Sequence, residues 1–352
     1  MRERIVALPV RENDSIFRWT VIATTEERFS NFAPYVPSVN DEDTVAFQAA
    51  LRGEDTGVFS GDGRAIAEVV GPILLAGVTS HPDLNNSGAT SFYGELANGA
   101  QGVFLLREGR LLTIASTRDG FDAIGPLGPT MNEAGTVAFR AEQTAGVSGV
   151  FAGDGADTVT VADTEGSWSE FHGLPVIDGH GTVVFRADRE DGVQGIYAGR
   201  GGSVETIAET GDVFESLGSF PSANVGGTVA FAATLRVGGA GIFTVEAGQI
   251  VQVLGTWDAF ESCRGALISD AGAVVCIATP RGGSLGLFAG PDPDADRILA
   301  LGDRLLGSTV ADLAANPVSI NSDGHVAVRA ALADGRQVIL RADPTDSCEP
   351  AF

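Results

Sequence analysis

Histidine, arginine and carboxylate side chains carry much of the acid–base chemistry of proteins, and this sequence of 352 residues holds only four histidines. An imidazole titrates near neutral pH, so it can act as a general acid, a general base or a metal ligand. His81 and His172 are the candidates for these roles. Arg118 and Arg264 are the candidates for stabilising negative charge on a substrate oxygen. A lyase or a hydrolase could use such a set, with or without a divalent cation.

A second set of side chains is suited to binding. Carboxylates recur in several loops, and a ring of them could hold a cation such as calcium or a polar small molecule. The alternative is that these acidic loops only keep an exposed rim soluble. The candidate ligand-binding residues are Tyr35, Asp83, Asp119, Asp212, Phe220 and Asp258. No C-x-x-C or H-E-x-x-H motif is present, so the sequence names no particular cofactor or metal.

The overall charge excludes one class of partner. The chain has 22 basic against 46 acidic residues, a formal net charge of −24, and all its basic residues are arginines. Duplex DNA and RNA require a concentrated basic face, so nucleic acid is not expected as a partner. The absence of lysine also excludes a P-loop lysine. No run of about 18 apolar residues occurs, so we expect no membrane span.

An eight-residue pattern, close to N-x-x-G-x-V-A-F, recurs seven times and reveals the elements that must position these residues. Its first positions are 40, 85, 132, 178, 224, 269 and 321. A second pattern, Gly–Val–Phe or a close variant, follows each of the first six copies at Gly57, Gly102, Gly149, Gly195, Gly241 and Gly286, and is degenerate at Gln337 in the seventh. A period of about 46 residues repeated seven times indicates a repeat architecture.

Each period contains four short β-rich runs separated by Gly, Asp and Asn turns. The third type of run includes 112–115, 159–162, 206–208, 251–254 and 298–301, and a fourth run precedes each turn, often with Pro three residues before the Asn position. Four strands per period is typical of a propeller blade. The sequence therefore predicts one all-β domain over 1–352, a seven-bladed β-propeller with four antiparallel strands per blade, its seven repeats spanning 29–342.

Ring closure gives a separate prediction. The seventh repeat has runs for only three strands, near 314–321, 325–330 and 336–341, before the tail at 343–352. The missing outer strand is expected at Trp19–Thr25, within the closing region 1–28, because this segment matches the third type of run. The N-terminus would then complete the last blade and fasten the ring.

This frame places the candidate residues. The turns at the Asn positions are expected on one face of the ring. The loops between second and third strands, and those from each outer strand to the next inner strand, are expected on the other. Residues two, four and six before the Asn position share one face of each inner strand, because side chains alternate with a period of two. His81, Phe220 and Asp83 belong to these rows, and so does His172. Two hypotheses remain for the histidines: an imidazole pair at the channel mouth, or partly buried groups hydrogen-bonded between blades.

Cys263 and Cys276 lie on the two strands beside one turn, where a cross-strand disulfide and a reduced, packed pair are both open. Cys348 lies in the tail.

The repeat resembles the bacterial tandem-repeat propeller proteins whose units read N-x-x-G-x-V-A-F-x-A, many of them exported and uncharacterised. The resemblance covers about residues 29–342 and implies the fold, but no reaction. Unlike the exported members, this chain shows no visible signal sequence. As written it is expected in the cytoplasm, and it would be exported if a signal peptide had been removed.

Two functional hypotheses follow. In the first, the ring is a binding module, expected to be monomeric, that presents its acidic loop face and central channel to a small molecule, a glycan or a protein. In the second, it is a propeller enzyme, a lyase or hydrolase acting on a small polar substrate at the channel mouth. His81 and His172 would then act as acid and base, beside Arg118 or Arg264.

Overall fold

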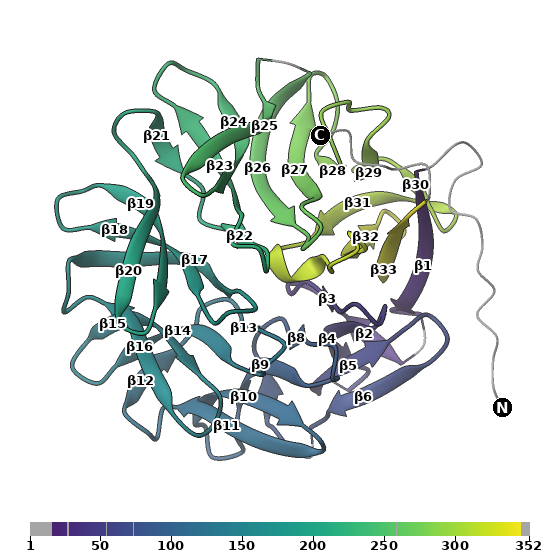
Figure 1. Ribbon diagram of the computed structural model, residues 1–352. Coiled ribbons are helices and arrows are strands. Elements are labelled where there is room, and N and C mark those ends of the chain that lie inside the picture. Colours follow the sequence, from purple (N-terminus) through teal and green to yellow (C-terminus); the bar gives the residue numbers. More distant parts are fainter. Residues whose placement is uncertain (1–15, 27, 54, 73, 258, 346–352) are drawn as a thin grey trace.

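The computed structural model describes residues 16–345 except Glu27, Glu54, Ile73 and Asp258. These residues form seven antiparallel sheets arranged as blades around a central axis (Figure 1). The prediction of an all-β, seven-bladed propeller is thus confirmed. The described part of the chain has one helical segment, the 3₁₀ helix η1 (Pro317–Ser319). It contains no helix with the length and hydropathy needed to cross a membrane.

The first three blades follow the chain from Phe29 to Asp163. Blade 1 contains β2 (Phe29–Asn31), β3 (Ser38–Val39), β4 (Val45–Leu51), β5 (Thr56–Gly61) and β6 (Ile66–Val70). Blade 2 contains β7 (Gly77–Val78), β8 (Asp83–Leu84), β9 (Thr90–Glu95), β10 (Gln101–Arg107) and β11 (Arg110–Ser116). Blade 3 contains β12 (Phe121–Ile124), β13 (Thr130–Met131), β14 (Val137–Gln143), β15 (Val147–Gly153) and β16 (Thr158–Asp163).

The next three blades repeat this plan. Blade 4 contains β17 (Trp168–Ile177), β18 (Val183–Arg189), β19 (Gln194–Arg200) and β20 (Ser203–Glu209). Blade 5 contains β21 (Phe214–Leu217), β22 (Ser222–Ala223), β23 (Val229–Leu235), β24 (Ala240–Glu246) and β25 (Gln249–Gly255). Blade 6 contains β26 (Phe260–Ile268), β27 (Val274–Pro280), β28 (Gly286–Phe288) and β29 (Arg297–Ala300).

Blade 7 closes the ring with both ends of the chain. It contains β30 (Arg304–Leu305), β31 (Ser308–Ala314), β32 (Val326–Leu332), β33 (Gln337–Pro344) and β1 (Phe17–Thr24). β1 pairs antiparallel with β33, and Figure 1 shows it at the outer edge of the last blade. The predicted closure is confirmed. The first strand of this blade, expected near 314–321, instead ends at Ala314, because Asn316 caps the 3₁₀ turn that Pro317 begins.

Paired aromatic rings explain why two motifs repeat twelve residues apart. The Phe that ends the first motif lies directly across from the aromatic residue of the second, as in Phe139↔Phe151 and Phe185↔Tyr197. Centroids of these pairs lie 5.7 and 5.8 Å apart. The glycine of the second motif is required beneath the ring: a Cβ on Gly149 would lie 2.8 Å from the Ala162 carbonyl oxygen and 2.9 Å from the Phe151 ring. Neighbouring blades pack the remaining apolar side chains between them, as in the core formed by blades 6 and 7.

The turn motif fastens five of the seven blades to the next through an asparagine side chain. The Oδ1 of Asn132 accepts the backbone N–H of Thr136 at 3.0 Å and closes its own turn, while its Nδ2 donates to the Asp178 carbonyl of blade 4 at 3.2 Å. The same second bond is made by Asn40, Asn85, Asn224 and Asn321. An amide side chain is needed here because it carries a donor and an acceptor at once.

Proline residues interrupt the inner strands where they pass the axis. β3, β8, β13 and β22 begin directly after Pro37, Pro82, Pro129 and Pro221, respectively. Proline has no N–H to offer a neighbouring strand, so the inner strand splits there. The residues before these prolines leave the regular ladder and form the wall of a cavity on the axis.

Candidate functional site

A central cavity of about 690 Å³ opens at the end of the axis opposite the N-x-x-G turns. Its wall comes from every blade except blade 4, mainly from the segments just before the inner-strand prolines. The wall is largely apolar, with Pro34, Pro126, Leu127 and Phe220 among its side chains. None of the described residues in the lining is an Asp or a Glu, although the chain has 46 of them. A volume of this size suits a small-molecule ligand.

Few polar side chains face this cavity. Tyr35, Thr79, Asn316 and Arg264 belong to its lining. Burial raises the pKa of Tyr35, so its hydroxyl stays protonated at neutral pH. Arg264 is exposed to the cavity, and the described residues supply no ion pair or hydrogen bond to its guanidinium. The described wall therefore contains one cationic side chain, Arg264, and several neutral hydrogen-bonding groups.

His81 is part of the wall and is committed to a bond between blades. It is 4% exposed, and its Nε2 lies 3.2 Å from the Pro129 carbonyl oxygen of blade 3. A carbonyl can only accept, so Nε2 carries the proton in this bond. Burial lowers the pKa of His81 to about 4. The ring lies over Gly128, where a Cβ would be 2.5 Å away. His81 is therefore a neutral group between blades at physiological pH.

His172 lies in blade 4, which contributes nothing to the cavity wall. Its Nε2 is 3.1 Å from Oδ2 of Asp188, and its Nδ1 is 3.9 Å from Oε1 of Glu170. Asp188 also pairs with the buried Arg186. Burial raises the pKa of Asp188, but hydrogen bonding and charge from Arg186, aided by His172, outweigh it and hold this pKa below its usual value. The structure therefore does not bring His81 and His172 into one cavity.

Asp83 lies at the other end of the axis. A narrower pocket of about 190 Å³ is lined there by the N-x-x-G turns and includes Asp83. Its Oδ2 accepts the Met131 N–H of blade 3 at 2.6 Å, and its Oδ1 accepts the Leu84 N–H at 2.9 Å. Burial raises the pKa of Asp83 to about 7. Thr130 joins blade 3 to blade 4 from the same row, so this position is an inter-blade fastener.

The loop residues lie outside the cavity lining. Arg118, Asp119 and Asp212 are exposed on the loops between blades and are absent from the wall. Asp258 is outside the described residues, as are Glu54 and Cys348. Of the predicted site residues, the structure brings together Tyr35, His81, Phe220 and Arg264. Cys263 and Cys276 are free thiols, and burial raises the pKa of Cys263 to about 11.

Leu127 and Asn316 are wall residues that sequence reasoning missed. They stand five residues before the Asn position, in the same row as Tyr35 and Arg264. In a regular strand, side chains of this row would point to the opposite face from those four and six residues before the Asn position. A register shift at Cys263/Gly265 places Arg264 in a β-bulge, and Leu127 has a left-handed φ of 77°. Pro129, two residues after Leu127, was a signal that the alternation fails there, and Pro317 directly after Asn316 was another.

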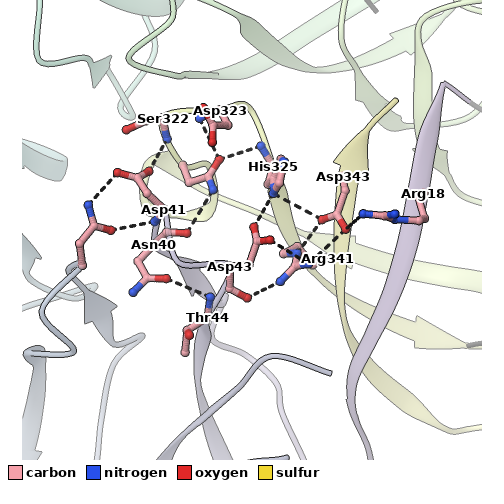
Figure 2. Close-up of polar contacts among 12 residues, drawn as sticks. Arg18, Asn40, Asp41, Asp43, Thr44, Ser322, Asp323, His325, Arg341 and Asp343 are labelled. Atoms are coloured by element: carbon pink, nitrogen blue, oxygen red, sulfur yellow. Dashed lines mark hydrogen bonds and ion pairs between the residues drawn. The ribbon is translucent and has the colours of Figure 1, made fainter. Parts of the chain in front are cut away.

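Within the described part of the chain, two groups of side chains have the composition of a metal site. The first is Glu170, His172 and Asp188, and the second is Asp43, His325 and Asp343. Figure 2 shows the second group at the seam between blades 7 and 1, where Arg341 contacts Asp43 and Asp343. In each group an arginine already neutralises a carboxylate. In both groups an arginine thus already offsets part of the negative charge that a cation would otherwise balance.

The model of a protein family described as "Family of unknown function (DUF7453)" matches residues 63–338. The chain belongs to the DUF7453 family. Comparison of this DUF7453 chain with curated proteins finds no match.

Solved structures share the propeller fold of the DUF7453 chain. One is an oligogalacturonate lyase in complex with manganese, with 9% identity and a TM-score of 0.60 over 94% of this chain and 98% of the lyase. Another is a puromycin-hydrolyzing peptidase of Mycobacterium tuberculosis, with 12% identity and a TM-score of 0.58 over 97% of this chain and 56% of the peptidase. TolB from Acinetobacter baumannii has 15% identity and a TM-score of 0.42, with 83% of this chain and 60% of TolB covered. The DUF7453 chain thus spans little more than half of the peptidase and of TolB. At these identities the likeness to the lyase and to the peptidase shows the fold alone, and the likeness to TolB carries no argument.

Proposed function

We propose that this protein is a binding module that holds one small molecule in the central cavity. The observation that carries the proposal is the cavity itself: about 690 Å³, with a mostly apolar wall and a few hydrogen-bonding groups. Small-molecule sites in proteins have this size and this composition. A glycan would require many more polar partners than this wall offers. A protein partner would contact the rim rather than the interior.

The chemistry of the wall favours binding over catalysis. Acid–base catalysis requires a group that gains and loses a proton near the working pH. The His81 ring is neutral and hydrogen-bonded to blade 3, and the described lining has no carboxylate to act with it. His172 lies in blade 4, outside the cavity wall. The support that the enzyme hypothesis keeps is a shared fold with a manganese-bound lyase and a puromycin-hydrolyzing peptidase.

A neutral fluorescent probe tests the proposal directly. N-phenyl-1-naphthylamine fluoresces when it enters an apolar site, so the folded protein should bind it with a saturable increase in emission. Thr79→Trp should weaken this binding at least tenfold, because Thr79 is an exposed residue of the wall and the indole would fill the cavity.

Thr113→Trp is the matched control, since Thr113 is also exposed but lies on the outer strand β11, away from the wall. It should bind the probe like the wild type. Circular dichroism would verify that both variants are folded. No saturable emission from the folded wild type, or equal binding by Thr79→Trp, would contradict the proposal.

A further inference from the structure

We propose that the molecule held in the central cavity is a small amphipathic carboxylate, with its carboxylate on Arg264 and its apolar body against Phe220 and Leu127. This inference rests on the proposed binding function and names the chemical class of its ligand.

The charge of the wall is the first argument. The chain has a formal net charge of −24, yet the described lining has no Asp or Glu and one arginine. The three buried arginines of the described chain are paired internally: Arg186 with Asp188, Arg329 with Asp312 and Arg341 with Asp343. Arg264 has no such partner among the described residues. An anionic ligand group would supply it.

The backbone directs this arginine into the cavity. Arg264 is the extra residue of a bulge in β26, between Cys263, which pairs with Ala278, and Gly265, which pairs with Ile277. A bulge leaves its extra residue out of the ladder and turns its side chain. Gly265, Ala266 and Leu267 follow in the same wall. Since these neighbours are small or apolar, no side chain next to Arg264 on this strand competes for its donors.

The apolar side of the wall is left open. Phe220 is 40% exposed and Leu127 is 38% exposed, although both are large apolar residues. Both belong to the cavity lining, from blades 5 and 3. Covering an apolar surface of this kind with a ligand removes it from water, which favours binding. A guanidinium presents two parallel N–H groups that match the two oxygens of a carboxylate. One carboxylate on an apolar body satisfies both parts of the site.

A matched pair of competitors separates the charge from the shape. With N-phenyl-1-naphthylamine as reporter, 2-naphthoate and 2-naphthamide would be titrated as displacing ligands. The two share a ring system and differ in whether the head group is charged. In the wild type, 2-naphthoate should displace the reporter at a concentration at least tenfold lower than 2-naphthamide.

Variants of Arg264 test whether this side chain causes the preference for the carboxylate. Arg264→Gln should bring the ratio of the two competitors close to one, and Arg264→Lys should give an intermediate ratio, because lysine keeps the charge but lacks the planar pair of donors. Arg118→Gln, at an exposed loop arginine outside the wall, should keep the wild-type ratio.

The outcomes distinguish the two proposals. A wild-type ratio near one, or a preference that survives in Arg264→Gln, would overturn the carboxylate inference while reporter binding still supports the binding function. If the reporter itself fails to bind the folded protein, the binding function fails and the inference falls with it.

Discussion

At the residue scale, His81 and Asp83 illustrate how burial can remove groups from catalysis and give them a structural role. They lie two residues apart in blade 2, both are buried, and both hydrogen-bond to backbone atoms of blade 3. Burial disfavours the charged form of each, so it lowers the pKa of the histidine to about 4 and raises that of the aspartate to about 7. Both side chains are therefore neutral over much of the interval between these values.

These shifts predict opposite effects of pH on the free energy of unfolding. In the unfolded chain His81 becomes protonated below pH 6.5, whereas in the folded protein it becomes protonated only near pH 4. Acidification between these values therefore destabilises the fold, by up to about 3 kcal/mol. At Asp83 the folded protein keeps its proton up to about pH 7, whereas the unfolded chain releases it above 3.8, so acidification towards 3.8 stabilises the fold by up to about 4 kcal/mol.

Urea unfolding of His81→Gln and Asp83→Asn at pH 4.5 and 7.5 checks both signs. Relative to the wild type, His81→Gln should gain stability on acidification, and Asp83→Asn should lose it, each by about 2–3 kcal/mol. Parallel pH profiles of the wild type and both variants would contradict this explanation. The double variant should return a profile close to that of the wild type.

At the element scale, the asparagine turns form a chain of hydrogen bonds around the ring that is interrupted at two seams. Asp178 and Ser269 occupy the Asn position in blades 4 and 6, and neither has an amide N–H to donate to the next blade. In the row two residues before the Asn position, Asp83, Thr130, Ser222 and Ser319 bond to the next blade. Val176 and Leu267 have no polar side-chain group, and the buried hydroxyl of Ser38 has no hydrogen-bond partner among the described residues. The seam between blades 4 and 5 therefore depends more heavily on apolar packing between the sheets. At the seam between blades 6 and 7, the Ala271 N–H donates to the Ser322 carbonyl and the Ser322 hydroxyl donates to Asp270.

Reciprocal substitutions test this account of the turns. Asn132→Asp should lower the free energy of unfolding by about 1 kcal/mol, because the Asp178 carbonyl loses its donor. Asp178→Asn should raise the free energy of unfolding by about 0.5–1 kcal/mol by adding a donor towards blade 5. Asp119→Asn, on an exposed loop, controls for the removal of one negative charge. Equal denaturation midpoints for Asp178→Asn and Asp119→Asn would argue against the added bond.

At the scale of the whole molecule, closure of the ring depends on β1, the first described strand, which pairs with β33, the last one. Seven residues of β1 pair with β33, and Ile22 of β1 is fully buried in the core that links blades 7 and 1. The seam adds the network of Asp43, His325 and Arg341 (Figure 2). Asp43 stands where the other turns have glycine and adopts a φ of 61°, which Asp tolerates better than most residues. Its carboxylate reaches blade 7, which glycine could not do.

Loss of the closing contact should destabilise the ring as a unit. Ile22→Ala is expected to lower the free energy of unfolding by about 3 kcal/mol, as for other buried large-to-small substitutions. Val251→Ala, at an exposed position of the outer strand β25, should change it little. Unfolding would be followed by far-ultraviolet circular dichroism and by Trp19 fluorescence in a Trp168→Phe, Trp257→Phe background.

The two signals should change at one denaturant concentration in Ile22→Ala, because each blade packs on its neighbours around a closed ring. A Trp19 transition that clearly precedes the loss of strand signal would show instead that blade 7 opens alone.

The sequence by itself determined the number of blades, the four-strand plan and the closing strand. Each of these depends on a local pattern that repeats, such as the Phe139↔Phe151 pair, the glycine beneath it and the asparagine that closes its own turn. Trp19–Thr25 could be identified because it matches the other outer strands, and the structure places β1 there.

Only the tertiary structure decided which side chains reach the axis. The alternation of side chains holds in a regular strand, but prolines and a bulge break the inner strands there, so Arg264, Leu127 and Asn316 line the cavity against that rule. The fate of His81 depends on Gly128 and Pro129, which belong to the next blade and lie more than forty residues away. Contacts between blades decide whether an ionisable group is free or committed, and a pattern read within one repeat does not contain them.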